Sequence, residues 1–256
     1  MQCSSWRQAR CASGVVIVAL LALLFVSAQT SAPSAPPQTL PPASQPPPTQ
    51  LPSVQPVPPQ PTLLIMIDPA HGGSESGAVL NPAILEKDVT LGFALRLLQQ
   101  LSARGIQSQL VRNGDTTLST DQRALTVNSA HPALYIGIHA TSQGSGVRFY
   151  TAMLPVGSDD RGPFRDWQTA QSASRARSRS IQQQLAASVQ RMGVPVRSLS
   201  APLKPLSNVI VPALTIEIAP TTGDISQLTS ADYQQMIAVT TANALASMKP
   251  TLESAP

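Results

Sequence analysis

The stretch LLIMIDPAHGG, residues 63–73, decides the expected fold. Its first five residues are apolar and lie between Pro61 and Asp68, which is typical of a strand buried on both faces of a parallel sheet. His71 and two glycines follow, and the glycines let the backbone turn tightly beside the imidazole. A histidine just beyond a buried strand is therefore the starting point for both the architecture and the site.

Downstream of this stretch, strand patterns alternate with helix patterns. Strands are expected at 106–111, 133–139, 147–150 and 212–218, and helices at 86–103, 118–129, 172–192 and 230–248. Ser119 or Thr120 caps the second helix, and Gly105 and Gly193 follow the ends of two others. This alternation predicts an α/β fold, with a mostly parallel twisted sheet flanked by helices on both faces in a single domain.

The N-terminal quarter of the chain differs from the rest, because it carries no charged residue from position 11 to position 67. Arg7 and Arg10 precede an apolar run over 14–26, and small residues follow it. This pattern predicts a secretory signal peptide at residues 1–28. With its flanks the run reaches eighteen residues, so an uncleaved N-terminal membrane anchor is the alternative. Both predict an exported protein of the periplasm or cell envelope, which the anchor would tether to the inner membrane.

The next segment, residues 29–61, is predicted to be a disordered proline-rich linker. It holds thirteen of the chain's 25 prolines, and proline removes the backbone donors that helices and sheets need. Such a tether extends by up to roughly 3.1 Å per residue. A ligand for a proline-binding module is the alternative reading. The folded domain is then expected at 62–250, with a C-terminal tail at 251–256.

Charge and cysteine content exclude several classes of protein. Without the two arginines before the apolar run, 15 basic and 13 acidic residues remain, so no nucleic-acid partner is predicted. Both cysteines precede residue 12, which excludes disulfides, a thiol nucleophile and thiolate ligands from the folded domain. One basic cluster is interpreted as a solvated helix face, with contact to an anionic polymer as the alternative: Arg175, Arg177 and Arg179.

Four side chains lie where functional groups collect in such sheets, at the carboxyl ends of strands and in the following loops. They are His71, Glu86 at a helix start, His139 at the end of the strand 133–139, and Glu217 inside an apolar strand. The two histidines and Glu86 also have structural interpretations, as hydrogen-bonded histidines and a helix-capping glutamate. A buried carboxylate, however, needs a partner, a metal or a cleft. Two histidines and one carboxylate suit a catalytic zinc site, and also other divalent ions.

Five motifs in order give the chain a family resemblance. The motifs are Asp68–Gly73, Glu86–Asp88, Val111–Asp115 followed by Arg123, Gly137–Thr141 and Ile216–Ile218. With these motifs, the chain from residue 63 to 248 resembles the zinc-dependent N-acetylmuramoyl-L-alanine amidases of the type-3 class.

The resemblance implies a single catalytic domain with a bound Zn²⁺ ion. His71, Glu86 and His139 would be the metal ligands, and Glu217 the catalytic base. The implied substrate is peptidoglycan, cut at the amide between N-acetylmuramic acid and L-Ala of the stem peptide, in cell wall turnover or daughter-cell separation. Three further motif residues are expected to support loops rather than touch substrate: Arg112, Asp115 and Arg123.

The chain also departs from the family pattern. Ala70 replaces a glycine and requires a negative φ or some strain. Thr141 replaces an asparagine, Glu75 stands where many members have aspartate, and the run at 218–222 differs. These changes bear on substrate contacts and rate more than on metal binding. The third histidine, His131, is expected to be a surface turn residue.

Three alternative functions stay open at this point. The domain would be a catalytically weak or inactive peptidoglycan-binding module if the altered flanks had abolished turnover. The same ligand types would also serve a zinc peptidase that acts within the stem peptide. A membrane-tethered scaffold, in which the proline-rich segment is the working part, is the third alternative.

Overall fold

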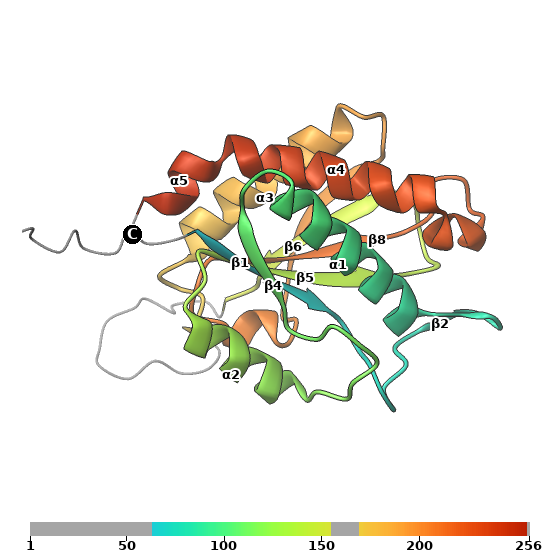
Figure 1. Ribbon diagram of the computed structural model, residues 1–256, viewed down its shortest axis with the longest axis horizontal. Helices are drawn as coiled ribbons and strands as arrows, with labels where there is room; N and C mark the ends of the chain where they lie inside the picture. The colour runs from blue at the N-terminus through green and yellow to red at the C-terminus, as the bar shows by residue number, and fades with distance from the viewer. Residues whose placement is uncertain (1–62, 155–168, 255–256) are drawn as a thin grey trace, which may run out of the picture. The chain divides into compact units, whose positions relative to one another are not determined.

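A six-stranded sheet forms the centre of the domain in the computed structural model, which describes residues 63–154 and 169–254 (Figure 1). The strand order is β4-β1-β5-β8-β6-β7. The first four strands are mutually parallel, whereas β6 runs antiparallel to β8 and carries β7 parallel to itself. The strands are β1 (Leu64–Pro69), β4 (Gln107–Leu110), β5 (Leu134–Ala140), β6 (Val147–Ala152), β7 (Val196–Ala201) and β8 (Ala213–Ile218).

Helices cover both faces of the sheet, as predicted. In Figure 1, α1, α3 and α4 lie on one side and α2 on the other. The short helix η2 packs with α2 against the second face. The bounds are α1 (Glu86–Ser102), α2 (Thr120–Ala130), α3 (Arg175–Gln190), η2 (Leu206–Asn208), η3 (Ile225–Thr229), α4 (Ala231–Ser247) and α5 (Lys249–Glu253).

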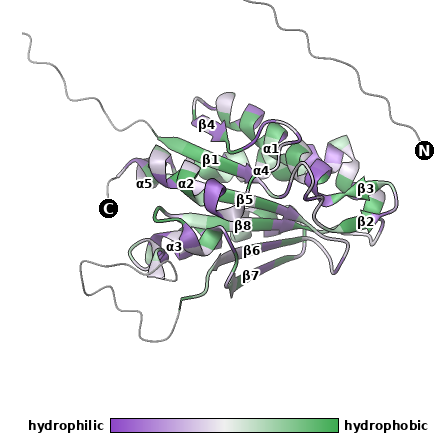
Figure 2. Ribbon diagram, turned by 90° about the horizontal axis from the view of Figure 1, so that it is seen from below, coloured by the Kyte–Doolittle hydropathy of each residue, from purple (hydrophilic) through white to green (hydrophobic). Residues whose placement is uncertain are grey.

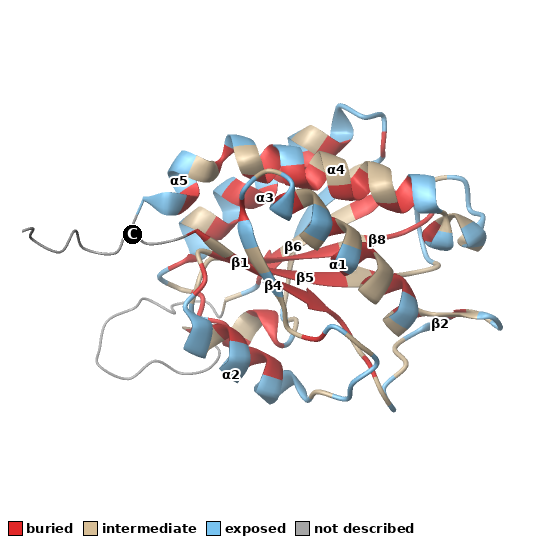
Figure 3. Cartoon of the chain, in the orientation of Figure 1, coloured by how far each residue is buried: buried red, intermediate tan, exposed pale blue. Residues whose placement is uncertain are grey.

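Strand side chains alternate between two unequal cores. In β8, Leu214 and Ile216 enter the large core under α1, α3 and α4, whereas Ala213 enters the small core under α2 and η2. The central strands are mostly buried in Figure 3, and β1 is largely hydrophobic in Figure 2. Because the small core covers only part of its face, the remaining side chains of that face line an open cleft at the carboxyl ends of β1, β5 and β8.

Both ends of α2 are capped. Ser119 accepts a hydrogen bond from the backbone of Gln122, whose side chain in turn caps the backbone of Ser119. This reciprocal arrangement is the capping box, and it confirms the predicted helix start. His131 closes the helix in the left-handed region with φ 45°, and it is exposed, as expected for a surface turn residue.

Several elements differ from the predicted ones. The hairpin β2 (Val79–Asn81) and β3 (Ile84–Leu85) and the strand β7 were not predicted, because short or exposed strands carry little apolar signal. Helix α3 begins at Arg175 rather than 172. Helix α5 extends the domain beyond 250, into the predicted tail.

The prediction of a solvated arginine cluster is wrong for one of its three members. Arg177 is half-buried, and its Nη2 donates to the carbonyl oxygens of Thr251 and Leu252, at 2.5 and 2.8 Å. It therefore holds α5 against α3. Arg175 and Arg179 are exposed, as expected.

The predicted signal peptide or anchor (1–28) and the linker (29–61) lie outside the described residues. Within the described part of the chain, none of the helices has the length and apolar character needed to cross a bilayer.

Candidate metal centre and catalytic cleft

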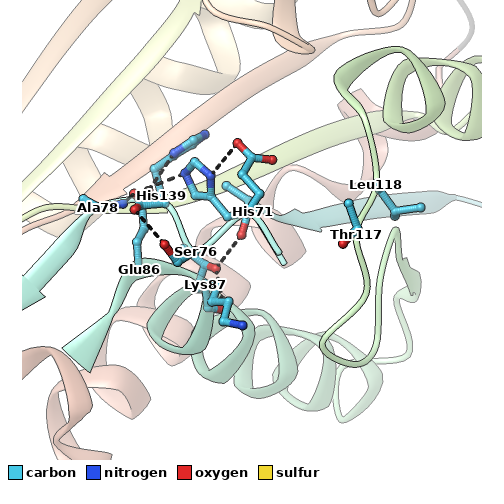
Figure 4. A network of polar contacts seen from close by, with 12 residues as sticks. His71, Ser76, Ala78, Glu86, Lys87, Thr117, Leu118 and His139 are labelled. Carbon is cyan, nitrogen blue, oxygen red and sulfur yellow. Dashed lines mark hydrogen bonds and ion pairs between the residues drawn. The ribbon is translucent and has the colours of Figure 1, made fainter. Parts of the chain in front are cut away.

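The structure brings His71, Glu86 and His139 together (Figure 4). His71 follows β1, His139 is the second-to-last residue of the neighbouring strand β5, and Glu86 is the first residue of α1. The ligand atoms that the three residues offer lie within 4.8 Å of one another. Parallel pairing of β1 with β5 brings the two histidines to one edge of the sheet, which is why residues 68 positions apart meet.

The Glu86 carboxylate bridges the two imidazoles. Its Oε1 lies 2.8 Å from His139 Nδ1, and its Oε2 lies 3.1 Å from His71 Nε2. Two backbone N–H groups add support, because Ala78 donates to Oε2 at 2.9 Å and Ala140 donates to Oε1 at 3.2 Å. The other ring nitrogen of His71, Nδ1, lies 3.1 Å from Glu75 Oε1.

The electrostatics of the cluster favour an ionised carboxylate between cationic or metal-binding groups. Burial opposes ionisation of Glu86, but its hydrogen bonds with His139, His71 and Ala78 hold the pKa of the carboxyl well below its usual value. The hydrogen bond to Glu86 raises the pKa of His71, although burial partly opposes this. A buried anion facing two imidazole nitrogens is the environment in which a divalent cation binds.

The backbone of His71 is in the left-handed region, with φ 63°. Ala70 takes the first of the two expected alternatives, a negative φ, because among the described non-glycine residues positive φ falls only on His71 and His131. Arg123 Nη2 donates to the His71 carbonyl at 2.6 Å and holds this turn. Gly77, with φ 68°, completes the site: a Cβ there would lie 2.5 Å from the His71 ring and 2.8 Å from Glu86 Oε2.

Beneath this turn lies a buried polar network. Asp68 is 2 % exposed and pairs with Arg123 through Oδ1, while Tyr135 donates to its Oδ2 at 2.8 Å. Burial and the Asp68 carboxylate raise the pKa of Tyr135 well above its ordinary value, so its phenol remains a donor. The network fixes the strand end from which His71 projects.

Arg112 and Asp115 hold the adjoining loops, as expected. Arg112 is 4 % exposed and donates to the carbonyl oxygens of Pro69, Ala70, Gly114 and Lys87. Asp115 accepts from the Gly73 N–H at 2.6 Å and from Lys87 Nζ at 2.8 Å. Both residues tie the loop after β4 to the His71 turn and the start of α1.

Glu217 lies on β8, beside the cluster of His71, Glu86 and His139. It pairs in register with His139 of β5 on one side and with Arg148 of β6 on the other. Its Oε2 accepts from Arg148 Nη1 at 2.5 Å and from Tyr150 Oη at 3.1 Å. The hydrogen bond to Glu217 in turn raises the pKa of Arg148, with burial opposing. The carboxylate that looked anomalous in an apolar strand therefore lies beside His139 and has two hydrogen-bond partners.

The cleft runs from this cluster toward α2. Its walls come from β1, the His71 turn, α2, β5, β8 and the loop before η2, and its lining includes Glu75, Thr120, Gly137, Lys204 and Thr215. Gly137 lies on the floor of the cleft. A larger residue there would crowd this floor, because even its Cβ would lie 3.0 Å from the Thr215 hydroxyl. The metal candidates thus lie in a solvent-accessible site rather than in a closed structural one.

Tyr135→Phe is expected to lower the free energy of unfolding by about 1–3 kcal/mol, because Asp68 Oδ2 would lose its hydroxyl donor in a buried place. Urea denaturation of the metal-free protein measures this without the contribution of bound metal. Tyr150→Phe is the matched control, since Tyr150 is only partly buried, and it should change stability by less than about 0.5 kcal/mol. Equal midpoints for wild type and Tyr135→Phe would contradict the assigned role of the network.

All four residues selected from the sequence thus converge on one edge of the sheet: three form the cluster and Glu217 stands next to it. Sequence reasoning missed Arg148 and Tyr150. They lie in the first four residues of an antiparallel strand, whereas functional groups were expected at the carboxyl ends of strands. The alternation of Arg148 and Tyr150 with apolar Val147 and Phe149 was the available signal.

The chain is similar to known proteins in sequence and in fold. A family model described as N-acetylmuramoyl-L-alanine amidase matches residues 65–247. The amidase LytC of Bacillus subtilis is 34% identical over 125 residues, which are 49% of this chain and 23% of that protein. The amidase AmiC of Escherichia coli O6:H1 is 33% identical over 97 residues, 38% of this chain and 22% of the relative. The chain therefore spans about a quarter of the length of these two relatives.

Solved structures share the fold. The catalytic domain of CwlV from Paenibacillus polymyxa superimposes with a TM-score of 0.59 at 21% identity, over 74% of this chain and 99% of that one. An N-acetylmuramoyl-L-alanine amidase from Clostridium difficile 630 gives 0.60 at 22% identity, over 74% and 98%. Since the family model covers most of the chain and all the site residues, the chain belongs to the N-acetylmuramoyl-L-alanine amidase family.

Proposed function

We propose that the protein is a zinc-dependent N-acetylmuramoyl-L-alanine amidase. It hydrolyses the amide between N-acetylmuramic acid and L-Ala of peptidoglycan stem peptides. The observation that carries the proposal is the placement of two imidazoles and a buried carboxylate within 4.8 Å of one another in an open cleft, with a further carboxylate on the next strand. Family membership supplies the reaction class.

The residues present fit zinc. Imidazole nitrogen and carboxylate oxygen are both zinc ligands, and three protein ligands in an open cleft are the pattern of catalytic zinc sites. His71, Glu86 and His139 would hold the ion, and Glu86 is already disposed to be ionised. A bound divalent ion supplies Lewis-acid activation of water and of the scissile carbonyl.

The chain's own residues supply the remaining chemistry. Glu217 accepts the proton of the attacking water and returns it to the leaving nitrogen. Glu75 orients the His71 ring through Nδ1, as carboxylates commonly do for metal-binding histidines. Arg123 fixes the backbone of the same histidine through its carbonyl.

Location follows from the N-terminal sequence. We propose that residues 1–28 export the protein to the periplasm or cell envelope, where peptidoglycan lies, and that residues 29–61 give the domain reach. Retention of the apolar segment would tether the protein to the inner membrane.

The test is mass analysis of products from purified peptidoglycan incubated with the protein and zinc, and separately with a chelator. We expect chelator-sensitive release of intact stem peptides that begin at L-Ala, with the glycan strands left uncut. The Glu217→Gln variant, purified in the same way, is the matched control. Any contaminating hydrolase would still release peptides in its presence.

Two other outcomes would contradict the proposal. Cleavage between residues of the stem peptide would identify a zinc peptidase. Binding of metal and peptidoglycan without cleavage would identify a binding module.

A further inference from the structure

We propose that Arg148 is a positioning residue for Glu217, and that it fixes which carboxylate oxygen faces the reacting groups. This inference rests on the proposed function, since it concerns the base of that reaction. The sheet topology brings the two residues together. Strand β6 is antiparallel to β8, so Arg148, near the start of β6, pairs in register with Glu217, near the end of β8.

The two donors on Glu217 use the same oxygen. Arg148 Nη1 lies 2.5 Å from Oε2, and Tyr150 Oη lies 3.1 Å from that same atom. Among the described residues, none makes a hydrogen bond to Oε1. The carboxylate is therefore held by one oxygen while the other stays available to accept a proton.

The guanidinium is itself fixed on its other side. Arg148 Nη2 donates to the Gln143 carbonyl at 2.6 Å, in the loop between β5 and β6. This loop is shaped around the side chain, because a Cβ on Gly144 would lie 2.0 Å from Arg148 Nη2. Gly144 also has φ 79°, which glycine adopts without strain.

These contacts favour positioning over substrate binding. Nη1 donates to Glu217 and Nη2 donates to a backbone carbonyl, so each terminal nitrogen of the guanidinium already contacts a protein group. The Arg148 and Glu217 side chains are 18% and 23% exposed, which shields the pair from full solvation. Without Arg148, the Glu217 side chain would gain rotamers in which neither oxygen points at the reacting groups.

The experiment measures kcat and KM on a soluble muropeptide for wild type, Arg148→Gln, Arg148→Lys and Tyr150→Phe. Each arginine variant is also made in the Glu217→Gln background, and melting temperature and bound zinc are recorded throughout. Arg197→Gln is the matched control. Arg197 is exposed and lies opposite Arg148 on the neighbouring strand β7, one strand farther from the site.

We expect Arg148→Gln to lower kcat about 10-fold with KM and zinc content unchanged, less than the roughly 10²-fold loss that a misplaced group can cause. Arg148→Lys should recover part of the loss, since it restores a cationic donor, and Tyr150→Phe should show a smaller loss. In the Glu217→Gln background, Arg148→Gln should have no further effect, because a residue that acts only through Glu217 has nothing left to position.

Three results would overturn the inference. The first is an unchanged kcat in Arg148→Gln, and the second is a raised KM with unchanged kcat, which would identify a substrate contact. The third is a double variant, Arg148→Gln with Glu217→Gln, whose loss of kcat equals the product of the losses in the two single variants. An inactive wild type would instead refute the proposed function, so the two failures are distinguishable. If Arg148→Gln melts early, Arg148→Lys and Tyr150→Phe still test the claim.

Discussion

Glu217→Gln is expected to retain its metal and to lose turnover by roughly 10²-fold or more. Glutamine keeps the size of the side chain, and its amide oxygen can still accept from Arg148 and Tyr150, so the local structure should persist. The amide cannot accept the proton of the attacking water. Initial rates on purified muropeptides, together with zinc content by atomic absorption, measure both consequences on the same preparation.

The combination of results identifies the role of the residue. Lost activity with full zinc content places Glu217 in proton transfer. Loss of zinc in parallel with activity would make it a ligand, and wild-type activity would remove it from the mechanism altogether. Glu253→Gln is the matched control, because Glu253 is an exposed carboxylate of α5, which packs against α4.

The central part of the fold was predictable from local patterns. Residues 63–67 are a continuous apolar run, which marks a strand covered on both faces, and the structure has β1 there. Ser119 or Thr120 was the predicted cap of α2, and the structure has Ser119 there, because helix capping is a local interaction. Such signals depend on neighbours in sequence and do not need the tertiary structure.

Strand direction and edge strands were not predictable in this way. β7 carries polar and exposed residues, because it lies at the edge of the sheet and makes few core contacts, so its pattern resembles that of a loop. The antiparallel direction of β6 follows from a connection whose geometry no local motif encodes. Arg148 was missed for this reason, since its place in the site depends entirely on that direction.

The metal candidates were predictable because the topology of parallel sheets is restrictive. Two histidines at the ends of parallel strands lie at one edge of the sheet, and the edge is where clefts form. The backbone at His71 was less accessible to sequence reasoning. Attention to Ala70 concerned only its own φ, which is negative as one alternative required, whereas the left-handed residue is His71, held by Arg123 from another element.

His71→Asn is expected to weaken zinc binding by more than roughly 100-fold and to abolish activity with it. Removing a partner behind a metal ligand already costs 10–100-fold, and here a ligand itself is removed. Asparagine is chosen because His71 has φ 63°, and asparagine tolerates the left-handed region better than most residues. The variant therefore removes the imidazole while leaving the turn intact. Zinc titration calorimetry on the metal-free protein measures the affinity directly.

His131→Asn is the matched control, since His131 is also left-handed, with φ 45°, but is exposed at the end of α2. The pair of variants separates the imidazole from the backbone: both place asparagine at a positive φ, and only one removes a ring from the cluster. Equal zinc affinity in the two variants would exclude His71 as a ligand. If His71→Asn kept zinc and still lost turnover, His71 would have to act on substrate or proton transfer, and the metal would have to be held by Glu86 and His139 without it.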